Sequence, residues 1–192
     1  MKRSAYLAAL STVLLAACGG GGSSSTATST TASTDTFAAL KATYAVACTG
    51  DTLRAQDGTI TKLESSQGTI TIATASGSNA TTVSLRSQYY VGSTDCAAST
   101  LNTDLTANGQ LSDKGTTKNY TDATGKTVTA KVATFTYTGM TLSKGNLSIS
   151  LPTAGTTTDI AYVLDGSNLY VTKGVRGADG LGDSLSRAAV KQ

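Results

Sequence analysis

Beyond residue 40, apolar and polar side chains alternate along many short stretches of the chain. Successive side chains of a β-strand point to opposite faces, so this alternation is typical of strands with one buried face. The stretches are residues 44–48, 59–63, 69–72, 83–91, 126–138, 147–151, 160–164 and 169–171, and residues 184–190 are expected to form a last short strand that closes the sheet. Their spacing of about 8–12 residues predicts an all-β fold, an antiparallel barrel or sandwich of about eight to nine strands.

Two motifs are expected to form turns between strands. The stretch Asp165-Gly166-Ser167-Asn168 separates residues 160–164 from residues 169–171 and predicts a tight hairpin. Asn108-Gly109 is a second turn signal, so a turn is expected there as well.

The clearest strand, residues 126–138, carries two apolar sets in different phases. One set is Val128, Ala130 and Val132, and the other is Phe135 and Tyr137. Because a strand cannot change phase without help, the pattern predicts a β-bulge or bend near Ala133-Thr134.

The first residues have the layout of an export signal. Lys2 and Arg3 form a positively charged start, and an apolar run from Ala5 to Ala17 follows. This layout is typical of a secretory signal peptide, and the run is too short to span a bilayer comfortably.

The apolar run ends in Leu15-Ala16-Ala17-Cys18. These four residues match a lipobox, so the N-terminus resembles the signal peptides of bacterial lipoproteins. The resemblance implies that residues 1–17 are removed, that the Cys18 thiol receives a diacylglyceryl group, and that the new amine is acylated, as with palmitate. The alternatives are an ordinary signal peptide with a coincidental cysteine, or a core helix, which the polar tract that follows argues against.

The segment after Cys18 indicates to which membrane the lipoprotein is sorted and how far the domain can extend from it. Gly19 stands where an aspartate would retain an enterobacterial lipoprotein in the inner membrane, so the resemblance implies the outer membrane, on either its periplasmic or its cell-surface face. From Gly19 to Thr34 the chain contains Gly, Ser, Thr and Ala alone, which cannot bury enough surface to offset the entropy of ordering. Residues 18–35 are therefore expected to be a lipidated cysteine and a flexible tether with an r.m.s. reach of roughly 20–25 Å.

Residues 36–192 are expected to form a single β domain. The chain has 15 basic and 12 acidic side chains, and loss of Lys2 and Arg3 leaves 13 basic ones, so the formal charge falls from +3 to +1. Because the processed domain is nearly neutral and has no basic patch, nucleic acid is not expected as a partner.

Two cysteines remain in this domain, Cys48 and Cys96. An even pair in an exported domain is expected to form a disulfide, with a free thiol pair as the alternative. A metal site is not expected, since two thiols are too few ligands and the chain contains no histidine.

The residue types also argue against catalysis. Without histidine, Ser-His-Asp and Cys-His arrangements are excluded within the chain. The spacing of the aspartates does not suggest a carboxylate pair for sugar hydrolysis. No catalytic residue and no cofactor are expected, and an unrecognised hydrolase is the remaining enzymatic alternative.

Two polar features are the expected contact points for a ligand or partner. Residues 174–183 lack the spacing of a calcium or phosphate loop and are expected to form a long polar loop that presents Arg176, Asp179 and Asp183. Tyr89 and Tyr90 are adjacent in one strand, so they face opposite sides and one of them is expected to be exposed. The tyrosines on several strands either line a cavity for a small amphipathic ligand or serve as ordinary core residues.

A second resemblance concerns the β domain. It rests on Tyr89-Tyr90 before Asp95-Cys96, on residues 159–162 before residues 168–171, and on the tail from Leu181 to Arg187. In these patterns the chain is similar to small, mostly uncharacterised proteobacterial lipoproteins with a lipocalin-like β domain. It has no tryptophan and therefore lacks the glycine-tryptophan signature of true lipocalins.

The sequence thus predicts a lipid-anchored outer-membrane lipoprotein with a non-enzymatic binding or envelope-structural domain. Its expected partners are the membrane, through the lipid anchor, and an envelope protein or small amphipathic ligand. The alternative is a lipocalin-like carrier of such a ligand.

Overall fold

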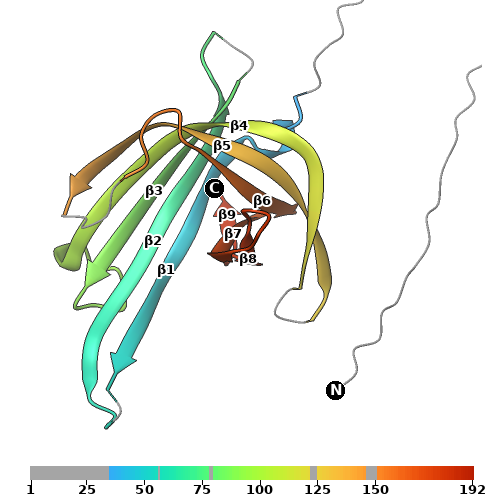
Figure 1. Ribbon diagram of the computed structural model, residues 1–192. Helices are drawn as coiled ribbons and strands as arrows, with labels where there is room; N and C mark the ends of the chain where they lie inside the picture. Colours follow the sequence, from blue (N-terminus) through green and yellow to red (C-terminus); the bar gives the residue numbers. More distant parts are fainter. Residues whose placement is uncertain (1–34, 56, 78–79, 122–124, 146–150) are drawn as a thin grey trace, which may run out of the picture. The chain divides into compact units, whose positions relative to one another are not determined.

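The computed structural model describes residues 35–192 apart from residues 56, 78–79, 122–124 and 146–150 (Figure 1). Within this part, nine strands and two short 3-10 helices belong to one compact unit. The strands are β1 (Ala42–Arg54), β2 (Ile60–Thr74), β3 (Thr81–Val91), β4 (Leu101–Thr121), β5 (Thr127–Lys144), β6 (Thr157–Asp165), β7 (Asn168–Arg176), β8 (Gly182–Leu185) and β9 (Ala189–Lys191). The 3-10 helices are η1 (Ala38–Leu40) and η2 (Ala98–Thr100). The expected signal peptide, Cys18 and the tether up to residue 34 lie outside the described residues.

The strands are antiparallel and close into a ring. Hydrogen-bonded neighbours follow the order β6-β5-β4-β3-β2-β1-β9-β7-β8, and β6 also pairs with β7. The ring therefore consists of β1 to β7 and β9, while β8 pairs with β7 outside it. The long strands β4 and β5 bend strongly around the short C-terminal strands in Figure 1. The predicted antiparallel all-β fold is confirmed.

The C-terminal part of the chain completes the ring. The predicted hairpin is confirmed, since Asp165 pairs with Asn168 across Gly166, whose φ is +57°. The expected closing strand at residues 184–190 is divided between β8 and β9. Of these, β9 closes the ring, because it pairs with both β1 and β7.

Side chains that point into the ring form the main core, at alternating positions as the sequence pattern predicts. Its buried members are Phe37, Leu40, Tyr44, Ile72, Val83, Leu111, Ala133, Phe135, Tyr162, Leu169 and Ala189. Two segments expected as separate strands, residues 59–63 and 69–72, belong to the continuous β2. Gly68 lies between them, and a Cβ at this position would come within 2.5 Å of the Arg86 carbonyl oxygen of β3, so glycine permits the close pairing. Most of the expected strand at residues 147–151 lies outside the described residues.

A β-bulge or bend was predicted near Ala133-Thr134, and the register of β5 against β4 does shift at Ala133. Its extra residues are not on β5, which changes apolar phase because it is buried on both faces. From Lys131 to Thr136 it pairs with β6 without a register shift. Phe135 faces the ring, whereas Ala130 and Val132 belong to a second cluster with Tyr120, Ala161 and Leu181. The extra residues lie on β4, where the step from Asp113 to Thr117 opposes the shorter step from Ala133 to Lys131.

The expected turn at Asn108-Gly109 is wrong, since both residues lie inside β4. A register shift between them coincides with close packing against β5. A Cβ on Gly109 would come within 2.4 Å of the Phe135 Cζ atom and 2.5 Å of the Thr136 carbonyl oxygen. The glycine is therefore required by the aromatic ring beside it and not by a turn.

This packing predicts that Gly109→Ala destabilises the fold by about 1–3 kcal/mol, because the aromatic ring of Phe135 and the backbone of Thr136 must move away from the new methyl group. Urea unfolding followed by circular dichroism would measure the loss. Gly139→Ala on β5 is the matched control, since a Cβ there meets no atom within 4 Å, and we expect a change within about 0.5 kcal/mol. Equal stability of the two variants would contradict the role given to Gly109.

Candidate functional site

A cavity of about 210 Å³ lies inside the ring. Its walls come from the inward-facing side of several strands and are mainly apolar. Lining side chains include Ile70, Leu85, Phe135, Tyr137, Ile160 and Val171. All six are large, yet together they leave the ring incompletely filled, which is unusual for a protein interior.

One end of the cavity is closed by η1 and β6. Leu40 and Tyr162 line it, and both are buried, with 4% and 5% of their surface exposed. The Phe37 ring lies 6.2 Å from the Tyr162 ring, and the Tyr44 hydroxyl donates to the Leu40 carbonyl oxygen at 2.9 Å. Burial, and secondarily the negative charge of Asp113, raises the pKa of Tyr162 to about 12, so the phenol itself is neutral at pH 7.

The other end lies where β6 and β7 separate. Their backbone pairing extends from Asp165 and Asn168 to Tyr162 and Val171 and stops there. Beyond this point β6 pairs with β5, and β7 turns away to pair with β8. The two strands therefore form a V-shaped split in the wall of the ring.

Side chains of β7 bridge this split. The Thr172 hydroxyl oxygen accepts a hydrogen bond from the Ala161 backbone N–H at 3.0 Å. The Arg176 guanidinium donates through Nη1 to the Asp159 carbonyl oxygen at 3.2 Å and to the Gly180 carbonyl oxygen. Thr172 and Arg176 also line the cavity, and Arg176 is exposed, so the cavity reaches the surface at the split.

The charge at this opening is positive. The Asp159 carboxylate accepts from Lys114 Nζ at 2.6 Å and from the Thr134 hydroxyl at 2.8 Å. These hydrogen bonds, Lys114 first, lower the pKa of Asp159, and the charge of Arg176 adds to the effect. Lys114 thus neutralises the Asp159 carboxylate, whereas Arg176 takes part in no ion pair among the described residues.

The polar loop after β7 is packed against the ring more than the sequence suggests. Asp179 pairs with Lys118 at 2.7 Å and accepts from the Leu181 N–H at 3.1 Å, and these contacts lower its pKa. Leu181 is buried, and Tyr120 donates to the Gly182 carbonyl oxygen. Asp179 is therefore committed to a structural contact.

The remaining expected contact residues lie elsewhere. Asp183 is exposed beside Ser184 on β8. Tyr89 is half-buried on β3 with its hydroxyl 3.4 Å from Lys62 Nζ, and Tyr90 is only 3% exposed. Of the five expected contact residues, Arg176 lines the cavity and the other four do not.

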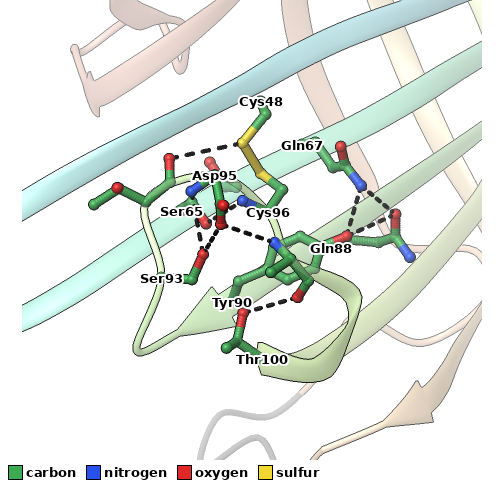
Figure 2. The surroundings of a disulfide bond; sticks show 12 residues. Cys48, Ser65, Gln67, Gln88, Tyr90, Ser93, Asp95, Cys96 and Thr100 are labelled. Carbon is green, nitrogen blue, oxygen red and sulfur yellow. Dashed lines mark hydrogen bonds between the residues drawn. A yellow bond between two sulfur atoms is a disulfide. The ribbon is translucent and has the colours of Figure 1, made fainter.

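Tyr90 belongs to a corner held by the disulfide between Cys48 and Cys96, which confirms the predicted pairing (Figure 2). Cys48 sits where β1 shifts its register against β2, and Cys96 lies in the loop after β3. The Cys96 N–H donates to the Ser65 hydroxyl oxygen at 3.1 Å. The Tyr90 hydroxyl accepts from Gln67 Nε2 at 2.6 Å.

The same face of β3 and β4 carries a satisfied charge pair. Arg86 donates to Asp104 through Nε at 3.0 Å and Nη2 at 2.6 Å, and Gln88 adds a bond at 3.3 Å. Asp104 is 6% exposed, and the hydrogen bonds from Arg86 are the main cause of its lowered pKa. Because Arg86 and Asp104 are paired with each other, we assign this corner a structural role.

Searches for other chemistry and for relatives found nothing. No described group of three or more His, Cys, Asp or Glu side chains could hold a metal ion. Within the described residues, no helix is long and apolar enough to span a membrane. Neither a family model, nor a curated protein, nor a solved structure matches the chain.

Several cavity residues were not predicted as a site. The alternating pattern places Ile70 and Leu85 on inward faces, but it cannot show that the interior stays partly empty. Thr172 carries no signal in the sequence, because its role depends on the separation of β6 from β7.

Proposed function

We propose that this chain is a lipid-anchored lipoprotein of the bacterial outer membrane, whose β domain is a non-enzymatic binding or envelope-structural module. The lipobox Leu15-Ala16-Ala17-Cys18, followed by the Gly/Ser/Thr tract, is the observation that carries the proposal. The disulfide between Cys48 and Cys96 supports export, since disulfides persist mainly in oxidising compartments.

The non-enzymatic part of the proposal is supported by the state of the charged groups. The chain contains no histidine to serve as a general base. Asp104, Asp159 and Asp179 are each held in an ion pair with a lysine or arginine. Carboxylates held in this way keep a lowered pKa, which is unfavourable for a general acid or base near neutral pH.

Replacement of the lipidated cysteine tests the anchor. In a Gram-negative host, Cys18→Ser is expected to move the protein from the membrane fraction to the soluble periplasmic fraction and to abolish labelling by radioactive palmitate. Acyl chains contribute about 0.8 kcal/mol per buried methylene, so their loss removes the attachment. Ser23→Ala in the tether is the control and should keep both signals. Unchanged membrane retention of Cys18→Ser would refute the proposal.

A second function is favoured by the cavity. A ring with a partly empty apolar interior and an opening at the β6–β7 split is suited to carry a small amphipathic ligand. In this function the tether would hold the carrier near the membrane, and the ligand would enter through the split.

A further inference from the structure

The cavity combines an apolar interior with one cation at its opening. Ile70, Leu85 and Ile160 line its body, and Arg176 lines it at the split. At the closed end the lining side chains Leu40 and Tyr162 carry no charge themselves at neutral pH. A ligand that fills the cavity therefore meets hydrocarbon along its length and a guanidinium at one end.

The guanidinium has donors to spare. Nη1 is used by the carbonyl oxygens of Asp159 and Gly180. Among the described residues, Nε and Nη2 of Arg176 make no hydrogen bond, and no carboxylate pairs with the side chain. Two adjacent N–H groups of an arginine match the oxygens of a carboxylate or phosphate in a bidentate fork.

The backbone contacts of Nη1 also orient the side chain. They tie Arg176 across the split to β6 and to the loop before β8. Rotamer entropy that is already spent in the free protein need not be lost on binding. The Thr172 hydroxyl lies on the same side of the split and lines the cavity as well.

The volume limits the length of an apolar tail. At about 30 Å³ for a water-sized group, a cavity of about 210 Å³ holds roughly seven such groups. A methylene is of similar size, so a tail of roughly seven carbons would fill the space. A fifteen-carbon tail would leave about half its length outside.

We propose that the cavity binds an amphipathic anion with a short alkyl tail, the tail filling the interior and the carboxylate or phosphate head held by Arg176 at the β6–β7 split. This inference rests on the second proposed function, the carrier. It adds the charge of the head, the residue that recognises it and the length of the tail.

The test is calorimetric titration of the full chain carrying Cys18→Ser, so that no lipid anchor competes for the probe. Octanoate and octyl phosphate are the anionic probes, 1-octanol is the neutral one, and hexadecanoate is the long one. We expect the first two to bind, and the tighter of the two identifies a carboxylate or a phosphate source. Hexadecanoate is expected to bind no more tightly than octanoate.

The variant Arg176→Gln tests recognition of the anionic head separately from binding of the alkyl tail. Loss of a charge-assisted hydrogen bond at an exposed group is expected to weaken octanoate about tenfold and to leave 1-octanol unchanged. The matched control is Arg54→Gln, because Arg54 is also exposed and donates to a backbone oxygen, that of Gly58, on the β1–β2 turn. This control should bind octanoate as the parent does.

The outcomes distinguish the two levels of the proposal. If octanoate and 1-octanol bind but Arg176→Gln weakens neither, the carrier stands and the anion site is overturned. If hexadecanoate binds more than tenfold tighter than octanoate, the tail length is overturned. If no probe binds, the carrier function itself fails. Val171→Phe, which fills the cavity from β7, should abolish binding of 1-octanol, and retention of binding would place the site outside the cavity.

Discussion

The double variant Cys48→Ala/Cys96→Ala is expected to lose about 4 kcal/mol of stability relative to the parent. The disulfide joins residues separated by 48 positions, and closing a loop of that length removes about 4 kcal/mol of chain entropy from the unfolded state. This is a large share of the total for a domain of this size. Urea unfolding at neutral pH, followed by circular dichroism, measures the difference.

The loss should be concentrated at the corner shown in Figure 2. Without the disulfide, the loop of residues 92–100 is attached to β2 by two hydrogen bonds, from Gly92 N–H to the Leu63 carbonyl oxygen at 2.8 Å and from Cys96 N–H to the Ser65 hydroxyl oxygen at 3.1 Å. A Cβ on Gly50 would come within 2.2 Å of the Thr94 carbonyl oxygen, so this loop lies directly on β1. Hydrogen exchange is therefore expected to accelerate at residues 92–100 and at β1 near Gly50, before it changes in β5.

Reduction provides an independent control. A phosphine reductant should lower the stability of the parent to that of the double variant and should leave the double variant unchanged. If the double variant is as stable as the oxidised parent, the disulfide does not support the fold. If reduction destabilises both proteins equally, the reductant acts elsewhere.

Local sequence patterns predicted most of the strands and their inward faces because both depend on neighbouring residues. The exception is β4, where the leucines are loosely spaced and a turn was expected instead of a continuous strand. The hairpin at Asp165 to Asn168 is one example, since strand and turn signals agree there. The disulfide could be predicted from the number of cysteines in an exported domain. These features need no knowledge of what packs against them.

The incorrect predictions concern residues whose role depends on contacts with segments distant in the sequence. Asn108-Gly109 has the composition of a turn, but the glycine is needed for the Phe135 ring of β5. The two apolar phases of β5 indicated a bulge, yet Leu181 from the loop before β8 covers Ala130 and Val132 on the outer face. The pattern of one strand cannot show that a distant loop buries its outer face as well.

In the candidate site, too, the sequence predicted a residue but not its three-dimensional surroundings. Arg176 could be named as a contact residue because it stands in a polar stretch of the sequence. That stretch, residues 174–183, was expected to be one loop, but β7 extends to Arg176 and β8 begins at Gly182. Its position at the mouth of a cavity follows from the separation of β6 and β7, which is a property of the closed ring. Asp179, in the same polar stretch, is instead paired with Lys118.

Alkaline pH is expected to destabilise the domain through Tyr162 at the closed end of the cavity. Burial raises the pKa of its phenol from 10.0 to about 12 in the folded protein. The unfolded chain therefore releases this proton at lower pH than the folded protein does. Stability is fully present below pH 10 and falls as the pH rises towards 12, by about 2.7 kcal/mol in the limit, since each pKa unit is worth about 1.36 kcal/mol.

Tyr162→Phe should remove most of this dependence. The variant keeps the ring that packs against Phe37 but has no proton to lose, so it should gain about 2 kcal/mol over the parent between pH 9 and pH 11.5. A residual slope is expected from Tyr44 and Tyr120, whose pKa values are also raised by burial. Tyr170→Phe removes a half-buried phenol from β7 and is the control, expected to follow the parent. A parallel pH profile for Tyr162→Phe and the parent would show that Tyr162 is solvated in the folded protein, which would contradict the closed end assigned to the cavity.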